Sequence, residues 1–359
     1  MATGETVIAP RRVLALPRIG RRHPVTLAAL GLVVLAIVFV AGVAIGSVPV
    51  APAETLAIVA RRLFGLDIPV TWQPSTEAII WELRIPRVLT AMVVGVGLSV
   101  AGATFQGLLR NPLADPYVLG TASGAALGAA IAVVLPIELV VLQFGLVNAL
   151  AFVGALGAVL IVYRLSRTGG MAPMTSLLLT GYAVGSLLAA GLALAMFASG
   201  AALRQIVSFL LGSFDASTWG RLAGAAPLIL IGSALVLYRA RSLNGLLLGE
   251  ETASHLGVDV KRERRILLAL GSLLTAAAVA VSGLIGFVGL VVPHVVRLVV
   301  GPNARLVIPL SAIYGAALLA TADIIARTLG EIPVGVVTAL IGAPFFLYIL
   351  RRTRTGYEL

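Results

Sequence analysis

The stretch that decides the fold is RIPRVLTAMVVGVGLSVAGATFQGLLRNPLADPYVLGTASGAALGAA, residues 84–130. Two apolar runs rich in small residues, about 84–109 and 117–135, flank a short polar segment. This segment holds Asn111 and Asp115, and a proline follows each of them. Proline interrupts helices, and Asn and Asp favour turns. The pattern therefore predicts two membrane helices joined by one tight polar turn.

The second of these helices carries glycines at a spacing of four residues. Gly120, Gly124 and Gly128 follow one another in this way. Residues four apart lie on the same side of a helix, and small residues there allow two helix backbones to approach closely within lipid. We expect these three glycines to form a helix-packing face.

The composition points to an integral membrane protein. Of the 359 residues, 59% are hydrophobic and only 11% are charged, and the mean hydropathy is +1.06. Soluble domains are about 25% charged. The net charge is +11, but the arginines fall between apolar runs, which indicates membrane topology and not a nucleic-acid partner. The chain has no cysteine, so it has no disulfide and no thiolate metal site.

The apolar runs predict an all-α polytopic membrane protein with about ten transmembrane helices. Residues 1–24 read as a cytoplasmic N-terminal tail, 25–352 as the ten-helix transmembrane domain and 353–359 as a cytoplasmic C-terminal tail. A signal peptide is the rival interpretation of the first apolar run, which is longer than a signal peptide needs. The ten expected spans are 25–46, 84–109, 117–135, 146–164, 174–198, 219–238, 266–284, 286–300, 307–327 and 334–350.

The arginines orient these spans. Most of them fall in the N-terminal tail, in the loops after the second, fourth, sixth and eighth spans, and at the C-terminus. Basic residues concentrate on the cytoplasmic side of membrane proteins. We therefore expect both termini to be cytoplasmic.

The chain has no nucleotide-binding loop of its own. Such a loop needs a lysine after a glycine-rich turn, and the only lysine, Lys261, follows Val258, Asp259 and Val260. If ATP drives this protein, another polypeptide binds the ATP and its Mg²⁺, so we expect no cofactor in this chain.

The longest polar stretch between spans, 243–263, is a candidate docking surface. It combines apolar residues with acidic ones, and Gly249 and Gly257 divide it into two short pieces. Two short helices of this kind fit a groove on a partner, whereas an idle loop needs no apolar side chains. The candidate contact residues are Leu246, Leu247, Gly249, Glu250, Glu251, Ala253, Leu256 and Gly257.

A carboxylate and a histidine lie inside the expected spans. Asp323 is four residues from Arg327, so an ion pair within one helix is the favoured interpretation. His294 follows Pro293 and stands alone, which favours a structural hydrogen bond over a haem or iron ligand. The sequence has no cluster of His and carboxylate residues, so we expect no catalytic residue and no metal site.

Four stretches resemble a known family: 84–128, 246–263, 281–297 and 321–346. The last of them leads into GVVTALIGAPFFLYILRR, residues 335–352. The family is the FecCD/BtuC-type ABC transporter permeases, the membrane subunits of importers for ferric siderophores, haem and vitamin B12. The resemblance implies the type II ABC importer permease fold, in the bacterial inner membrane. It also implies a homodimer, two ATPase subunits, and a periplasmic or lipid-anchored substrate-binding protein.

The resemblance assigns roles to several residues. The residues of 243–263 named above match the coupling helices that contact the ATPase. Arg84, Arg87 and Arg327 match arginines that pair with acidic residues of the binding protein, and together they would form a basic outer rim. Thr168, Gly169 and Gly170 match a cytoplasmic gate, although a plain turn explains them equally well from sequence.

Other classes of function remain open. An ion-coupled secondary transporter would place ionisable residues near the membrane midplane, and here Asp323 is the one candidate. A membrane-embedded enzyme needs a convergent set of His, Asp or Glu, and a structural scaffold needs none. Among cargoes, we rank iron chelates first and corrinoids second.

Overall fold

The computed structural model describes residues 23–46, 48–135, 140–141, 144–167 and 173–354. Within these residues the fold is helical apart from a two-residue antiparallel pairing in which Val140 faces Gly145. The elements are α1 (Pro24–Ala44), α2 (Pro52–Phe64), α3 (Pro74–Ala78), η1 (Ile79–Arg84), α4 (Ile85–Leu108), α5 (Thr121–Val134), β1 (Val140–Val141), β2 (Phe144–Gly145), α6 (Leu146–Leu165), α7 (Met174–Ala198), η2 (Gly200–Ala202), α8 (Leu203–Leu211), α9 (Trp219–Tyr238), α10 (Ala240–Leu247), α11 (Glu250–His255), α12 (Val260–Ser282), α13 (Val288–Val300), α14 (Ala304–Thr328) and α15 (Val334–Arg354).

The expected polytopic helical fold is confirmed. In the described part of the chain, seven helices are long and apolar enough to cross a membrane, and α3, η1 and α4 form one of them without interruption over Pro74–Leu108. The other three expected spans correspond to shorter apolar helices, namely α5, α13 and the first part of α15. A π-helical turn at η1 joins α3 to α4, so this span begins at Pro74, before its expected start at residue 84.

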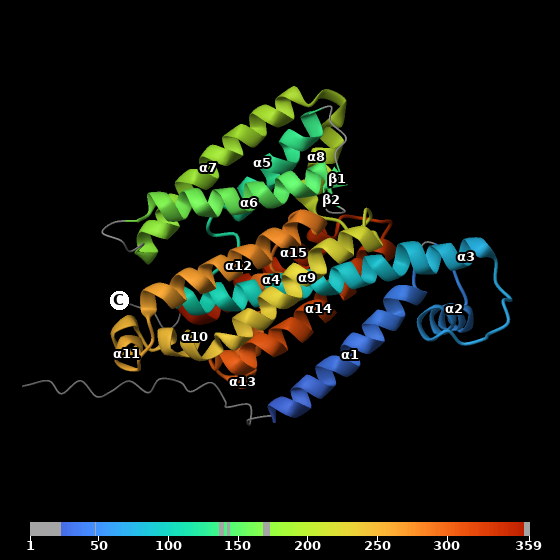
Figure 1. The fold of residues 1–359 in the computed structure, drawn as a ribbon, viewed down its shortest axis with the longest axis horizontal. Helices are drawn as coiled ribbons and strands as arrows, with labels where there is room; N and C mark the ends of the chain where they lie inside the picture. The colour runs from blue at the N-terminus through green and yellow to red at the C-terminus, as the bar shows by residue number, and fades with distance from the viewer. Residues whose placement is uncertain (1–22, 47, 136–139, 142–143, 168–172, 355–359) are drawn as a thin grey trace, which may run out of the picture.

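The helix at the centre of the bundle is α4. It packs against α14, α12, α13 and α9, and nearly all of its residues are buried. Figure 1 shows α5, α6, α7 and α8 gathered on one side of this centre and α1 running diagonally along the other side. The short helices α10 and α11 lie at one end of the bundle, whereas α2 and α3 lie at the opposite end.

Glycines allow α4 to pack so closely. A Cβ atom added at Gly95 would overlap the carbonyl of Gly315 in α14, and one added at Gly102 would overlap the carbonyl of Gly289 in α13. In lipid, where there is little hydrophobic drive between helices, such backbone contacts supply much of the packing energy. The small residues of the opening stretch thus place α4 directly against both neighbours.

Two more helix starts differ from the sequence prediction by at least four residues. α5 begins at Thr121 and not at 117, because residues 109–120 are held in a turn that ends with Gly120 at a φ of +77°. α12 begins at Val260 and not at 266, because the Asp259 side chain accepts a hydrogen bond from the backbone N–H of Arg262 at 3.0 Å. Capping of this kind stabilises the first turn of a helix, so α12 starts before the apolar run does.

Candidate functional site

A buried ion-pair cluster joins α4 and α14 at the end of the bundle opposite α10 and α11. The Asp323 side chain in α14 is 1% exposed. Its Oδ1 lies 2.9 Å from Nη2 of Arg87 in α4, and its Oδ2 lies 3.1 Å from Nε of Arg327. The expected pair within α14 is therefore confirmed, and it extends to a second helix. One carboxylate between two guanidinium groups compensates charges that would be costly to bury alone.

A second carboxylate extends this ion-pair cluster to the protein surface. Oδ1 of Asp215, in the connection between α8 and α9, lies 2.7 Å from Nη1 of Arg87. The Asp215 side chain is 57% exposed, so this pair is open to solvent and to partners. Arg87 thus links the core helices to a surface segment. Sequence reasoning missed Asp215, because nothing near residue 215 signals its partner.

The other two candidate docking arginines bind backbone carbonyls at the end of α1. Arg84 donates to the carbonyls of Val43 (3.0 Å), Ala44 (2.9 Å) and Val48. Arg327 donates to those of Gly42 and Ile45, both at 3.1 Å. The last carbonyls of a helix lack partners within the helix, so both guanidinium groups cap α1. Arg84 and Arg327 are buried. The basic outer rim expected from the three arginines is therefore wrong for Arg84 and Arg327. Of the three, Arg87 alone is partly exposed.

The turn between α4 and α5 is fixed by its own polar residues. Oδ1 of Asn111 accepts the backbone N–H of Leu113 at 2.9 Å, and Oδ1 of Asp115 accepts that of Tyr117 at 2.8 Å. The Tyr117 hydroxyl then donates to the carbonyl of Ile285 at 2.9 Å, between α12 and α13. Burial raises the pKa of the Asp115 carboxyl, and the hydrogen bond from Tyr117 partly offsets this. The polar turn thus ties α4 and α5 to the start of α13.

The three candidate packing glycines do not share one interface. Cβ atoms added at Gly124 and Gly128 would overlap the carbonyls of Gly154 and Leu150, both in α6. Gly120 precedes α5, and its nearest neighbours belong to α7. The prediction of a single glycine face is wrong for Gly120, because the helix starts after this residue.

The candidate coupling segment folds as the two short helices α10 and α11. Gly249, at a φ of +113°, separates them, and Gly257, at +79°, follows α11. Leu246 and Ala253 are buried, so they join the two helices to the bundle and do not face a partner. The exposed residues of the segment are Leu248, Glu251, Thr252, Ser254, His255, Leu256, Gly257, Asp259, Lys261 and Arg262. Leu248 is the apolar member of this surface that the candidate set lacks.

Ion pairs fix the coupling segment to the bundle. The Glu250 carboxylate pairs with Arg264 in α12, and its Oε1 also lies 3.7 Å from Nη2 of Arg110, just after α4. Beside them, Arg239 pairs with Glu263 at 2.6 Å. Glu250 thus links α11 to α12 and to the end of α4 while its side chain stays 39% exposed. Glu251 and Asp259 are the exposed acidic residues of the segment.

His294 lies among hydrogen-bonded groups between α13 and α4. Nη1 of Arg297 donates to Oε1 of Gln106 at 3.0 Å, and Nε2 of Gln106 donates to the carbonyl of Leu290 at 3.0 Å. The carbonyl of Pro112 accepts a hydrogen bond from His294. Within the described residues, no group of three or more His, Asp or Glu could hold a metal ion. His294 therefore links α13 to the turn after α4.

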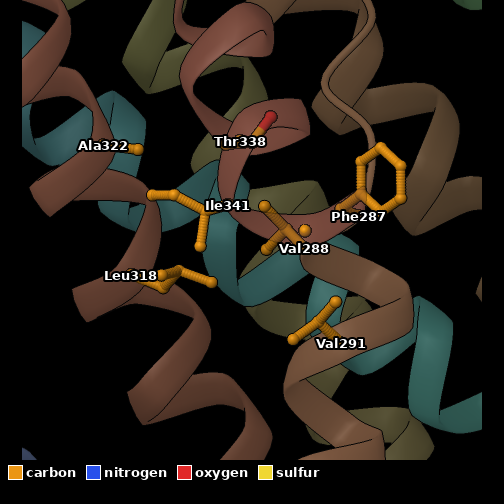
Figure 2. A pocket seen from close by; sticks show the side chains of 8 residues that line it. Phe287, Val288, Val291, Leu318, Ala322, Thr338 and Ile341 are labelled. Carbon is orange, nitrogen blue, oxygen red and sulfur yellow. The ribbon is translucent and has the colours of Figure 1, made fainter. Parts of the chain in front are cut away.

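A small cavity lies between α13, α14 and α15 (Figure 2). Figure 2 shows Phe287, Val288 and Val291 facing Leu318, Ala322 and Ile341 across it, with Thr338 at its edge. Its volume is about 20 Å³, room for about one water molecule. Pockets for organic ligands measure about 300–1,000 Å³, so this cavity is too small for a chelate.

The candidate gate residues Thr168, Gly169 and Gly170 lie outside the described residues. Helix α6 ends before them at Leu165, and α7 begins after them at Met174. Their role stays a prediction.

Comparison with known proteins places this geometry in context. Residues 34–352 match the model of the FecCD transport family. The cobalamin import system permease protein BtuC of Halobacterium salinarum is 47% identical over 84% of this chain and 79% of its own length. The hemin transport system permease protein HmuU of Yersinia pestis is 43% identical over 81% of this chain and 89% of its own length. A solved structure, assigned to a metal-chelate type ABC transporter in an inward-facing conformation, superposes with a TM-score of 0.77 at 31% identity, covering 91% of this chain and 99% of that chain.

Proposed function

The chain belongs to the FecCD transport family, and on that premise we propose that it carries an iron chelate, either a ferric siderophore or haem, across the inner membrane. It is the membrane-spanning permease subunit of an ABC importer, a transport subunit and not an enzyme. The observation that carries the proposal is the match of residues 34–352 to the family, together with relatives that are importer permeases over most of their own length.

We propose that two separate ATPase subunits, carrying ATP and Mg²⁺, bind at α10 and α11. The exposed face of these helices supports this, because Leu248 and Leu256 are apolar and lie beside the acidic Glu251. An amphipathic helix presenting such residues fits a groove on a partner. Glu250, Leu246 and Ala253 would hold the segment in position, so that a displacement of the segment reaches α4 and α12.

We propose that a second copy of this chain completes the transport pathway. Inside one copy, the cavity between α13, α14 and α15 holds about one water molecule, and a wider groove of about 390 Å³ between α1, α13 and α14 has an almost wholly apolar lining with few polar groups to hold a chelate, which supports a pathway between two copies. A periplasmic or lipid-anchored binding protein would dock at the opposite end from α10 and α11, where Arg87 and Asp215 meet the surface. Both termini would lie in the cytoplasm, on the side of α10 and α11.

Corrinoids are the second candidate cargo. The relative named for cobalamin import is 47% identical to this chain, against 43% for the relative named for hemin transport.

Uptake into proteoliposomes tests the proposal. The chain is reconstituted with its ATPase and binding protein and offered ferric siderophore, haem and cobalamin in parallel vesicles. We expect ATP-dependent accumulation of one iron chelate. Accumulation of cobalamin alone would establish the second candidate. Uptake that follows an ion gradient without the ATPase would refute import driven by ATP.

A variant with Leu256→Asp in this chain tests the proposed ATPase contact. Leu256 is exposed on the proposed ATPase surface, so this change should leave membrane insertion intact. ATP-dependent uptake should fall to the level measured without ATP. Unchanged uptake by this variant would remove the assignment of α11 as the ATPase contact.

A further inference from the structure

Helix α2 presents an apolar face that no part of the described chain covers. Thr55 and Ile58 on one side are buried against the bundle. On another side Leu56 is 59% exposed and Leu63 is 61% exposed, and Phe64 at the helix end is 70% exposed. Residues seven apart lie on the same side of a helix, so Leu56 and Leu63 form one stripe. Such a stripe is costly to leave in water, at about 25 cal/mol per Å² of apolar surface.

The connections of α2 keep it beside the bilayer surface. It follows the membrane helix α1, which ends at Ala44, after residues 45–51 only, and the next span begins at Pro74. In Figure 1, α2 is seen almost along its axis, whereas α1, α4 and α14 run across the page. A helix that crosses the direction of the membrane helices, at their end, runs along the plane of the membrane surface.

The tryptophans mark the level of that surface independently. The chain has three tryptophans, Trp72, Trp81 and Trp219, and all three lie at this end of the bundle. The rings of Trp81 and Trp219 are 5.4 Å apart between centroids, and Nε1 of Trp219 donates to the carbonyl of Trp81 at 2.9 Å. Nε1 of Trp72 donates to Glu77 at 3.1 Å. Tryptophan is enriched where a membrane protein crosses the boundary between acyl chains and head groups.

Arg62 fixes α2 at the level of these tryptophans. Its Nε lies 2.6 Å from Oε1 of Glu77, the same carboxylate that binds Trp72. Its guanidinium also lies 6.0 Å from the ring centroid of Trp81. An arginine at this distance over an indole ring is attracted to it. α2 therefore cannot lie far above the tryptophan level.

We propose that α2 is an interfacial anchor, lying in the head-group region of the bilayer with Leu56, Leu63 and Phe64 inserted among the acyl chains. The occupant of the apolar stripe is a phospholipid surface. Amphipathic helices that bind membranes bury such a face about 5–10 Å into this boundary. Because Arg62 is already paired with Glu77, apolar insertion carries the anchor, and the exposed Arg61 is the cation of α2 that can meet a head group. This inference does not depend on which cargo the permease carries.

The absence of cysteine makes the test direct. Leu56→Cys, Leu63→Cys and the control Arg61→Cys are made separately in the full chain, spin-labelled and reconstituted in phosphatidylcholine vesicles. Arg61 is also exposed but lies five residues from Leu56, about 140° away around the helix. Collision rates of each label with oxygen, which concentrates in lipid, and with a water-soluble nickel chelate are measured by electron paramagnetic resonance.

We expect the ratio of oxygen to nickel collisions to be several-fold higher at residues 56 and 63 than at residue 61. Equal ratios at all three positions would show that the stripe faces water and would overturn the proposal. If the labels at 56 and 63 are protected from both reagents and their spectra are broadened by a nearby label, the stripe packs against a second copy of the chain. Labels that reach the nickel chelate until binding protein is added would assign it to that partner. Either result overturns the anchor.

Discussion

Asp323 in α14 and Arg87 in α4 form a buried ion pair, with 2.9 Å between carboxylate Oδ1 and guanidinium Nη2, although they are 236 residues apart in the chain. Arg327 holds the other carboxylate oxygen. An intramembrane carboxylate is usually a candidate for ion coupling. Here the carboxylate forms ion pairs with two arginines at the end of the bundle, and these pairs link α4 to α14.

We expect Asp323→Asn to destabilise the protein strongly. The change leaves two arginines without their shared counter-charge in a buried site, which costs about 3–5 kcal/mol. The control is Asp215→Asn, which removes the solvent-exposed partner of Arg87 and should cost less than about 1 kcal/mol. Thermal unfolding in detergent, followed by size-exclusion chromatography, measures both. Equal stability of the two variants would show that Asp323 is not a structural link.

The sequence predicted this cluster only in part, for a physical reason. The pair of Asp323 and Arg327 follows from helical periodicity, which acts over four residues. The pair of Asp323 and Arg87 depends on α4 packing directly against α14, and the sequence alone does not say which of ten helices become neighbours. The carbonyls that Arg84 and Arg327 bind have no sequence signature at all, because every residue carries one.

The local patterns were more informative about helices than about their partners. The apolar runs predicted ten spans, and glycines predicted the break between α10 and α11. The exposed and buried sides of the coupling segment depend on tertiary packing. Leu246 and Leu248 are both leucines two residues apart, yet one is buried and the other exposed. Only the structure distinguishes the one that holds the segment from the one that faces outward.

A larger side chain at Gly102 should disrupt the centre of the bundle. Its Cβ would overlap the backbone of Gly289, which cannot move aside as a flexible side chain could. We expect Gly102→Leu to cost at least about 1–3 kcal/mol and to reduce the yield of folded protein in detergent. Gly157→Ala in α6 is the control, because no neighbouring atom lies within 4 Å of its added Cβ. A folded yield for Gly102→Leu as high as that control would contradict the close packing of α4 with α13.

Substitutions at Leu248 and Leu246 should separate coupling from folding. Leu248→Asp changes an exposed residue, so we expect normal thermal stability and loss of stimulated ATPase activity in the complete importer. Leu246→Ala removes a buried side chain, which typically costs about 2–5 kcal/mol, and should lower the unfolding temperature. Both variants are measured for stability and for ATPase activity with and without binding protein. The assignment fails if Leu248→Asp retains full stimulation.

Replacing Arg84 with lysine should loosen the end of α1. Its guanidinium donates to the carbonyls of Val43, Ala44 and Val48 at once, and a lysine ammonium lacks the planar fork that spans them. In Arg84→Lys we expect the end of α1 to loosen, so that the backbone amides of residues 43–45, among them that of Ile45, which donates to the carbonyl of Ala41, exchange hydrogen with solvent several-fold faster than in the unchanged protein. Hydrogen exchange read by mass spectrometry measures this. The matched control is Arg61→Lys, since Arg61 on exposed α2 donates to a single carbonyl, that of Ile68, at 3.2 Å. Exchange that rises equally in both variants, or in neither, would show that the arginine fork does not hold the end of α1.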